Sequence, residues 1–113
     1  MNRERYIRIP KDKKAMEDYD YGIQTPEQMV ELVLSEEDYT FLEKVKVFDL
    51  INQQCDVIID DYEEEILDIF KIQQAIDVVN NLLAKYNDNE LLVKLKEYLE
   101  YELKYGTLVG FDF

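Results

Sequence analysis

Histidine is absent from this chain of 113 residues, which has one cysteine, three glycines and two prolines. Without histidine the chain lacks the commonest general base and the commonest zinc ligand, and a single cysteine cannot form an internal disulfide bond. The scarcity of glycine leaves little loop from which to build the deep cleft of a glycosidase. Cys55 has acids and no bases near it in the sequence, so we predict a small buried residue. We therefore expect no catalysis, no bound metal ion and no cofactor.

Long apolar runs are also absent. No run approaches the roughly 20 residues that span a bilayer, and the N-terminal MNRERYIRIP lacks the apolar segment of a secretory signal, so we expect a cytoplasmic protein. The hydrophobic fraction of 47% and the charged fraction of 35% are typical of a soluble globular protein. The length fits one domain, 1–113, in which residues 1–24 form a basic strand and an acidic loop that lead into a helical body.

Acidic side chains dominate the charge. Asp and Glu number 26 against 13 Lys and Arg, which gives a net charge of −13. Such a field repels phosphate backbones and anionic membranes and attracts basic surfaces, so we expect a basic protein as the partner and not a nucleic acid or a membrane. The charge is also divided along the chain. Residues 1–14 hold six bases and two acids, whereas 17–43 hold nine acids and 49–68 hold eight, both without a base.

The apolar pattern predicts a mainly α fold, a compact bundle of about four helices with short β-strands at the N- and C-termini. Residues 6–9, before Pro10, favour a strand because isoleucine and tyrosine suit a pleated surface. Residues 11–24 show no apolar periodicity and are predicted to be a loop. Residues 107–113 are rich in β-forming side chains and are predicted to form a second strand that pairs with the first.

Four segments carry helix signals. The segments 25–28 and 35–38 each resemble a helix start, with a threonine or serine cap followed by acidic residues or glutamine. The apolar residues at helical spacing are Met29, Val30, Val33 and Leu34; Phe41, Leu42, Val45, Phe48 and Ile51; Ile69, Ile72, Ile76, Val79 and Leu83, after Asp68; and Leu92, Leu95, Leu99 and Leu103, between Asp88 and Tyr105. Gly106 is expected to end the last of these helices. Residues 55–65 leave two possibilities open, a strand followed by a loop or a kinked helix.

Two groups of acids with interleaved tyrosines are the candidate partner-binding residues. They are Asp18, Tyr19, Asp20 and Tyr21 in the predicted loop, and Asp60, Asp61, Tyr62, Glu63 and Glu64. Tyrosine supplies a large contact area with few rotatable bonds, which suits a protein interface. Tyr98 and Tyr101 are added because they lie away from the leucine face of the last predicted helix; alternatively, these rings border the core. The second group fits no calcium loop, since it has no glycine at the turn and no alternation of ligands.

The step Asp60-Asp61-Tyr62-Glu63-Glu64 follows an apolar run, and the chain closes with GTLVGFDF. Together with the small size and the acidic, helical character, these segments resemble the small immunity proteins of bacterial polymorphic and contact-dependent toxin systems. The resemblance implies a non-enzymatic protein that binds and neutralises one cognate cytosolic toxin, by masking a basic active site or a nearby surface.

Two other functions stay open. A phage-encoded DNA mimic, of the anti-restriction or anti-CRISPR type, would imitate a row of phosphates with its carboxylates, and the two acid-only stretches permit an extended acidic face. The sequence does not separate this role from immunity, whereas the neighbouring gene would, because an immunity gene adjoins its toxin gene. An enzyme with a divalent ion would need carboxylates repeated on facing helices, and only Glu97 and Glu100 come close to that pattern.

Overall fold

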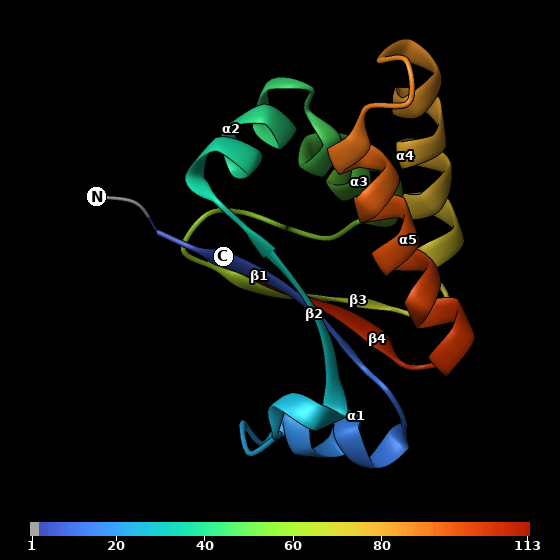
Figure 1. The fold of residues 1–113 in the computed structure, drawn as a ribbon. Helices are drawn as coiled ribbons and strands as arrows, with labels where there is room; N and C mark the ends of the chain where they lie inside the picture. Colours follow the sequence, from blue (N-terminus) through green and yellow to red (C-terminus); the bar gives the residue numbers. More distant parts are fainter. Residues whose placement is uncertain (1–2) are drawn as a thin grey trace.

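The computed structural model describes residues 3–113, which form a four-stranded antiparallel sheet with helices on both faces (Figure 1). In chain order the elements are β1 (Arg5–Pro10), α1 (Lys13–Asp20), the 3-10 turn η1 (Pro26–Gln28), β2 (Met29–Leu34), α2 (Glu36–Lys44), α3 (Val47–Cys55), β3 (Glu64–Asp68), α4 (Ile72–Lys85), α5 (Glu90–Tyr105) and β4 (Leu108–Asp112). The fold is therefore mixed α/β. The predicted bundle of about four helices is wrong, because two further strands join the terminal pair to make a complete sheet.

The two ends of the chain lie side by side at the centre of the sheet, whose strand order is β2-β1-β4-β3. Residues 6–8 of β1 pair with residues 110–112 of β4, so the predicted pairing of the terminal strands is confirmed. β2 and β3 pair with the outer sides of this central pair and form the two edges of the sheet. β3 is thus an edge strand, with Glu64, Ile66 and Asp68 exposed and Leu67 buried in the core.

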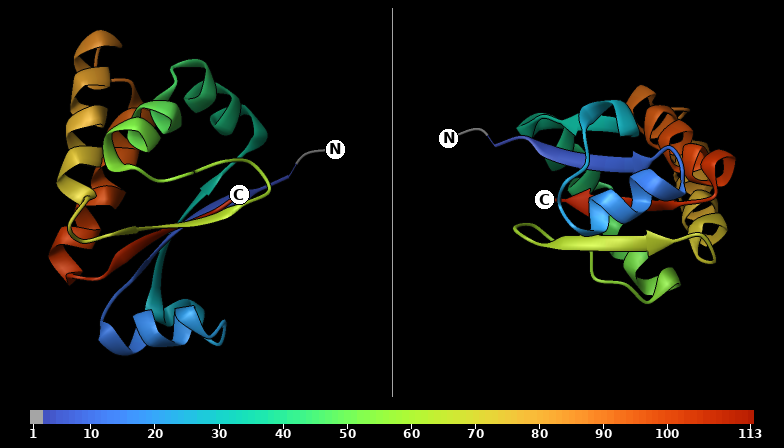
Figure 2. Two further views of the ribbon diagram at one scale, coloured as in Figure 1. Left: turned by 180° about the vertical axis from the view of Figure 1, so that it is seen from behind. Right: turned by 90° about the horizontal axis from the view of Figure 1, so that it is seen from below.

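The helices are distributed unequally over the sheet. Helices α2, α3, α4 and α5 cover one face, and α1 lies on the other, which we call the open face (Figures 1 and 2). Strand side chains alternate between the two faces, and Ile7, Ile9, Val109 and Phe111 are buried in the core shared with the helices. That core contains an aromatic cluster with ring centroids 5.0 to 6.2 Å apart, made of Tyr39, Phe48, Phe111 and Phe113.

Helix α1 occupies most of the segment predicted to be a loop, so that prediction is wrong. Its start is fixed by Asp12, whose side chain accepts a hydrogen bond from the backbone N–H of Ala15 at 2.8 Å. The helix buries only Ala15 and Asp18. One alanine and one aspartate make no apolar stripe, which is why periodicity did not reveal the helix.

Strand β2 replaces the first predicted helix. The capping box between Thr25 and Gln28 is present, but it closes only the single turn η1. Val30 and Val33 are β-branched and suit a pleated strand, and β2 pairs with β1 along six residues. The long-range pairing with β1 therefore overrides a local helix-start signal.

The middle of the chain also differs from the prediction. The second predicted helix is divided at Lys46, which adopts a left-handed conformation (φ 64°) between α2 and α3. Helix α3 ends at Cys55, a loop follows, and β3 begins at Glu64. Both possibilities for residues 55–65 are therefore wrong, because the loop precedes the strand and no kinked helix forms.

The two C-terminal helices were correctly predicted, although α4 begins at Ile72 and not near Asp68. Helix α5 ends at Gly106, which takes the left-handed conformation of a C-cap (φ 66°). The buried face of α5 differs from the prediction at its last position, where Glu102 is fully buried and Leu103 is 47% exposed. The Glu102 carboxyl oxygens have no hydrogen-bond partner within residues 3–113. Burial, with the nearby charge of Asp68, raises the pKa of Glu102 to about 8.

Candidate functional site

The basic N-terminal segment is folded into the acidic body. Arg5 is 3% exposed; its guanidinium donates hydrogen bonds to Asp61 and Glu36, both at 2.9 Å, and stacks on the Tyr39 ring at 3.8 Å from the centroid. The hydrogen bond from Arg5 holds the pKa of both carboxyls below their usual range. Arg3 pairs with Asp61 as well. The positive charge near the N-terminus is therefore largely neutralised by the protein itself.

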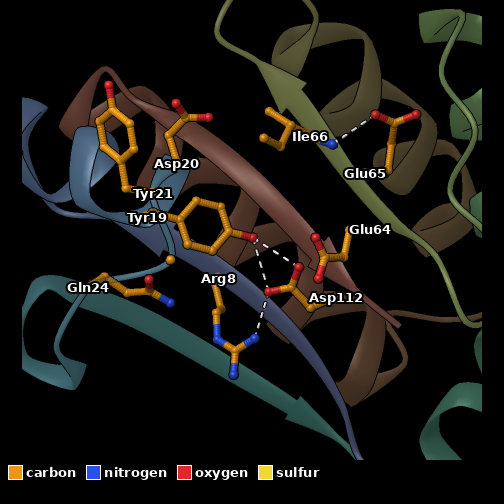
Figure 3. A pocket seen from close by; sticks show the side chains of 10 residues that line it. Arg8, Tyr19, Asp20, Tyr21, Gln24, Glu64, Glu65, Ile66 and Asp112 are labelled. Carbon is orange, nitrogen blue, oxygen red and sulfur yellow. Dashed lines mark hydrogen bonds and ion pairs between the residues drawn. The ribbon is translucent and has the colours of Figure 1, made fainter.

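A second network joins three strands to α1 on the open face. Arg8 forms ion pairs with Glu31 at 2.5 Å and with Asp112 at 2.6 Å. Figure 3 shows the pair with Asp112 and the Tyr19 hydroxyl, which lies 3.0 Å from each carboxylate oxygen of Asp112. Burial raises the pKa of Tyr19, and the adjacent charge of Asp112 adds to the effect. The Tyr19 ring lies against Gly110, whose missing side chain leaves room for it. Tyr19 therefore fixes α1 on the sheet.

The contact between Tyr19 and Gly110 gives a prediction for stability. A methyl group at Gly110 overlaps the Tyr19 ring, so the Gly110→Ala substitution should lower the free energy of unfolding by about 1–3 kcal/mol in urea denaturation. In a Tyr19→Ala background the same substitution should cost under about 0.5 kcal/mol, since the overlap is gone. Equal losses in the two backgrounds would contradict the contact.

The first predicted group is divided by α1 into buried and exposed members. Asp18 is buried and accepts hydrogen bonds from Gln28 and Lys14, both at 2.9 Å, which hold the pKa of its carboxyl below the usual range. Its side chain is thus used to fix the connection between α1 and η1. Asp20 and Tyr21, by contrast, are exposed, Tyr21 to 77%, and can contact a partner.

Free carboxylates gather along the edge strand β3 and the loop before it. Residues 56–68 hold seven acids and no base. Asp61 is occupied by Arg5 and Arg3, but the six others take part in no ion pair within the described part of the chain. Five of the six are exposed and one, Glu65, is half-buried. We call the five that lie within residues 60–68 the β3 acidic surface, although Asp60 borders a separate pocket beside α2 and α3: Asp60, Glu63, Glu64, Glu65 and Asp68.

Two strongly exposed aromatic rings flank β3. Tyr62 precedes the strand and is 79% exposed, and Phe70 follows it and is 90% exposed. Tyr62 is left-handed (φ 63°), which costs a residue other than glycine about 1 kcal/mol, and its N–H donates to the Asp61 side chain at 3.2 Å. The Arg3 guanidinium lies 4.0 Å from the Tyr62 centroid. Phe70 is not among the residues predicted from the sequence, although its place outside the apolar helical spacing was a signal of exposure.

A pocket of about 570 Å³ opens on the open face between α1 and β3 (Figure 3). Asp20 and Tyr21 border it on one side and Glu64 and Ile66 on the other. The pocket thus joins the exposed half of the first predicted group to Glu64 of the second. The other members of the second group lie in the loop that precedes β3, and they do not line this pocket.

Tyr98 and Tyr101 stand apart from this region. They belong to α5, which covers the opposite face of the sheet (Figure 1). Both rings are half-buried and pack against the hydrophobic core, with their centroids 5.5 Å apart. This arrangement agrees with the alternative that the rings border the core. Whether they also touch a partner stays a prediction.

Cys55 is buried, as predicted, and burial raises the pKa of its thiol. Across residues 3–113, no helix combines the length and the apolar character needed to cross a membrane.

Comparisons with known proteins show a likeness in fold. No protein-family model and no curated protein matches the chain. Among solved structures, the fold is similar to that of the Neisseria DNA mimic protein DMP12, with a TM-score of 0.66 and 17% sequence identity. The match covers 96% of this chain and 99% of that chain. The two chains therefore share their architecture over nearly their whole length.

Proposed function

We propose that this chain is a DNA mimic, a non-enzymatic protein that occupies the DNA-contacting surface of a basic protein. The β3 acidic surface takes the place of the phosphate backbone in this proposal. The observation that carries it is the pairing pattern: the three arginines are turned into ion pairs with the body, while five carboxylates around β3 lack a cationic partner within residues 3–113. Acids kept only for solubility are usually interspersed with bases, and residues 56–68 contain none.

The geometry of an extended strand supports the proposal. A β-strand rises roughly 3.3 Å per residue, close to the roughly 3.4 Å that separates successive phosphates along the axis of one DNA strand. Consecutive acids such as Glu63, Glu64 and Glu65 therefore bring negative charge to the start of β3 at a linear density comparable to that of one DNA strand, divided between the two faces because successive strand side chains point to opposite sides. A protein surface that binds DNA through lysine and arginine would meet a similar field here.

The comparison in fold supports the same function. The Neisseria protein DMP12, whose fold this chain shares, is itself described as a DNA mimic protein. An immunity protein would need a toxin as its partner, and the same surface would serve that role if the toxin site were basic. The two functions thus differ in the identity of the partner and in the place of its gene, and an experiment has to separate them.

The test is capture on the immobilised chain from a lysate of the native host, followed by elution with duplex DNA. We expect duplex DNA to release a DNA-binding protein at a salt concentration that alone does not release it. A variant with the five acids of the β3 acidic surface replaced by their amides should not capture this protein. A partner that saturating duplex DNA leaves bound would contradict DNA mimicry. A toxin encoded beside the gene of this chain would favour immunity instead.

A further inference from the structure

The open face of the sheet is hollowed along α1 beyond the pocket already described. A second pocket, of about 220 Å³, lies between α1 and the β3–β4 part of the sheet. It shares Tyr19, Asp20 and Ile66 with the larger pocket, so the two adjoin one another. We call the two adjoining pockets the α1–β3 groove. Figure 2 shows from below how α1 lies beside β3 on this face.

The groove has an apolar floor at the smaller pocket, whereas the larger pocket is lined mainly by polar side chains, among them Arg8 in its ion pair with Asp112. Met16 and Tyr19 of α1 face Ile66 of β3 and Leu108 of β4 across the smaller pocket. Ile66 is 43% exposed, although it lies near the middle of a strand. A surface that imitated only phosphates would need no such floor, because the DNA backbone offers charge and hydrogen-bond acceptors to its partners.

Both sides of the groove carry free acids. Glu17 and Asp20 of α1 and Glu64 of β3 line the pockets, and Asp68 lies beyond them on the same face of β3 as Ile66. All four are exposed, and none is in an ion pair within residues 3–113. The exposed ring of Tyr21 adds an aromatic face to which a cation can bind.

We propose that the α1–β3 groove binds an amphipathic basic helix of the partner protein. Such a helix presents an apolar stripe with lysine or arginine on both flanks, which matches an apolar floor between two acidic sides. This inference rests on the proposed function and adds the element of the partner that is recognised. It also divides the interaction into a part that depends on salt, from the acidic sides, and a part that does not, from the floor.

The test uses a short synthetic helical peptide of leucine and lysine, with its leucines on one face, and an oligolysine of equal charge. In calorimetric titrations we expect the amphipathic peptide to bind at least about tenfold more tightly than oligolysine, because only it can bury apolar surface on the floor. Amide shifts in the NMR spectrum should fall on residues 16–22, 64–68 and 108–112.

The matched pair of variants is Ile66→Asn and Val33→Asn. Both residues lie on the open face of an edge strand, and Val33 is exposed to a similar degree, 41%, but lies outside both pockets of the groove. Ile66→Asn should weaken the amphipathic peptide about tenfold without changing the dependence on salt, and should leave oligolysine binding unchanged. Val33→Asn should change neither.

Equal affinity for the two peptides, or equal effects of the two variants, would overturn the groove proposal. Neither result would bear on DNA mimicry, which the capture experiment tests through displacement by duplex DNA. The converse outcome is that duplex DNA fails to release the captured partner while the amphipathic peptide still binds the groove. That result would contradict DNA mimicry and would leave the groove as a peptide-binding site.

Discussion

Replacing four exposed acids of the β3 acidic surface by their amides should slow association with the captured partner roughly 100-fold at low salt. The substitutions are Asp60→Asn, Glu63→Gln, Glu64→Gln and Asp68→Asn. The expected cause is the loss of the local field that steers a basic surface toward β3. The association rate of the variant should also depend less on salt, since fewer charges remain to be screened. Stopped-flow or surface plasmon resonance kinetics at several salt concentrations give both quantities.

The matched control changes the net charge by the same amount elsewhere. Asp77→Asn, Glu90→Gln, Glu97→Gln and Glu100→Gln alter four exposed acids of α4 and α5, the helices on the opposite side of the sheet. At about 0.1 M salt, where the Debye length is about 10 Å, this control should reduce the association rate by less than about threefold, because its charges lie on the helices across the sheet from the open face. An equal reduction in the two variants would mean that only net charge matters and would contradict a localised surface.

Replacing Glu102 by leucine should stabilise the fold strongly at alkaline pH. The pKa of Glu102 is about 8 in the folded protein, against 4.5 for an ordinary glutamic acid. Between these values the folded protein holds a proton that the unfolded chain releases, so this group lowers stability as the pH rises from 4.5 to 8. Each unit of pKa difference corresponds to about 1.4 kcal/mol, and the burial that causes it is complete.

Urea denaturation at pH 5 and at pH 8 measures this effect. The advantage of Glu102→Leu over the unchanged protein should grow by about 3 kcal/mol between the two pH values, because the variant has no carboxyl to ionise in the core. All other titrating groups are common to both proteins and cancel in the comparison. The control is Glu100→Leu, which removes an exposed carboxyl of the same helix and leaves the buried one in place. Parallel stability profiles for the Glu102→Leu variant and the unchanged protein would contradict a neutral buried carboxyl.

Local signals predicted the helices that bury a regular apolar stripe. Helix α4 buries Ile72, Ile76 and Val79, and Gly106 ends α5, as expected from spacing and capping alone. The terminal strands were also predicted, since their composition favours β structure whatever they pair with. The prediction failed where pairing with a distant strand determines the secondary structure. Residues 29–34 follow a true capping box, yet pairing with β1 makes them a strand.

The acidic character of the site was predictable, but its layout was not. The acid-only run identified Glu64 and Asp60, whereas nothing in a linear pattern showed that Asp61 is occupied by Arg5. The opposite charges of the N-terminal segment and the body were the signal for such internal pairing. The groove needed the fold itself, because Met16 and Leu108 lie far apart in the sequence and meet only when α1 packs on the open face.

The central claim is that the β3 acidic surface and duplex DNA compete for one surface of the partner. Fluorescence anisotropy of a labelled duplex, bound to the captured partner and titrated with this chain, measures that competition directly. We predict that the anisotropy falls to the value of the free duplex. The variant with four acids of the β3 acidic surface replaced by amides should displace the duplex only at a much higher concentration. Anisotropy that stays constant or rises, as in a complex of chain, partner and DNA together, would contradict DNA mimicry.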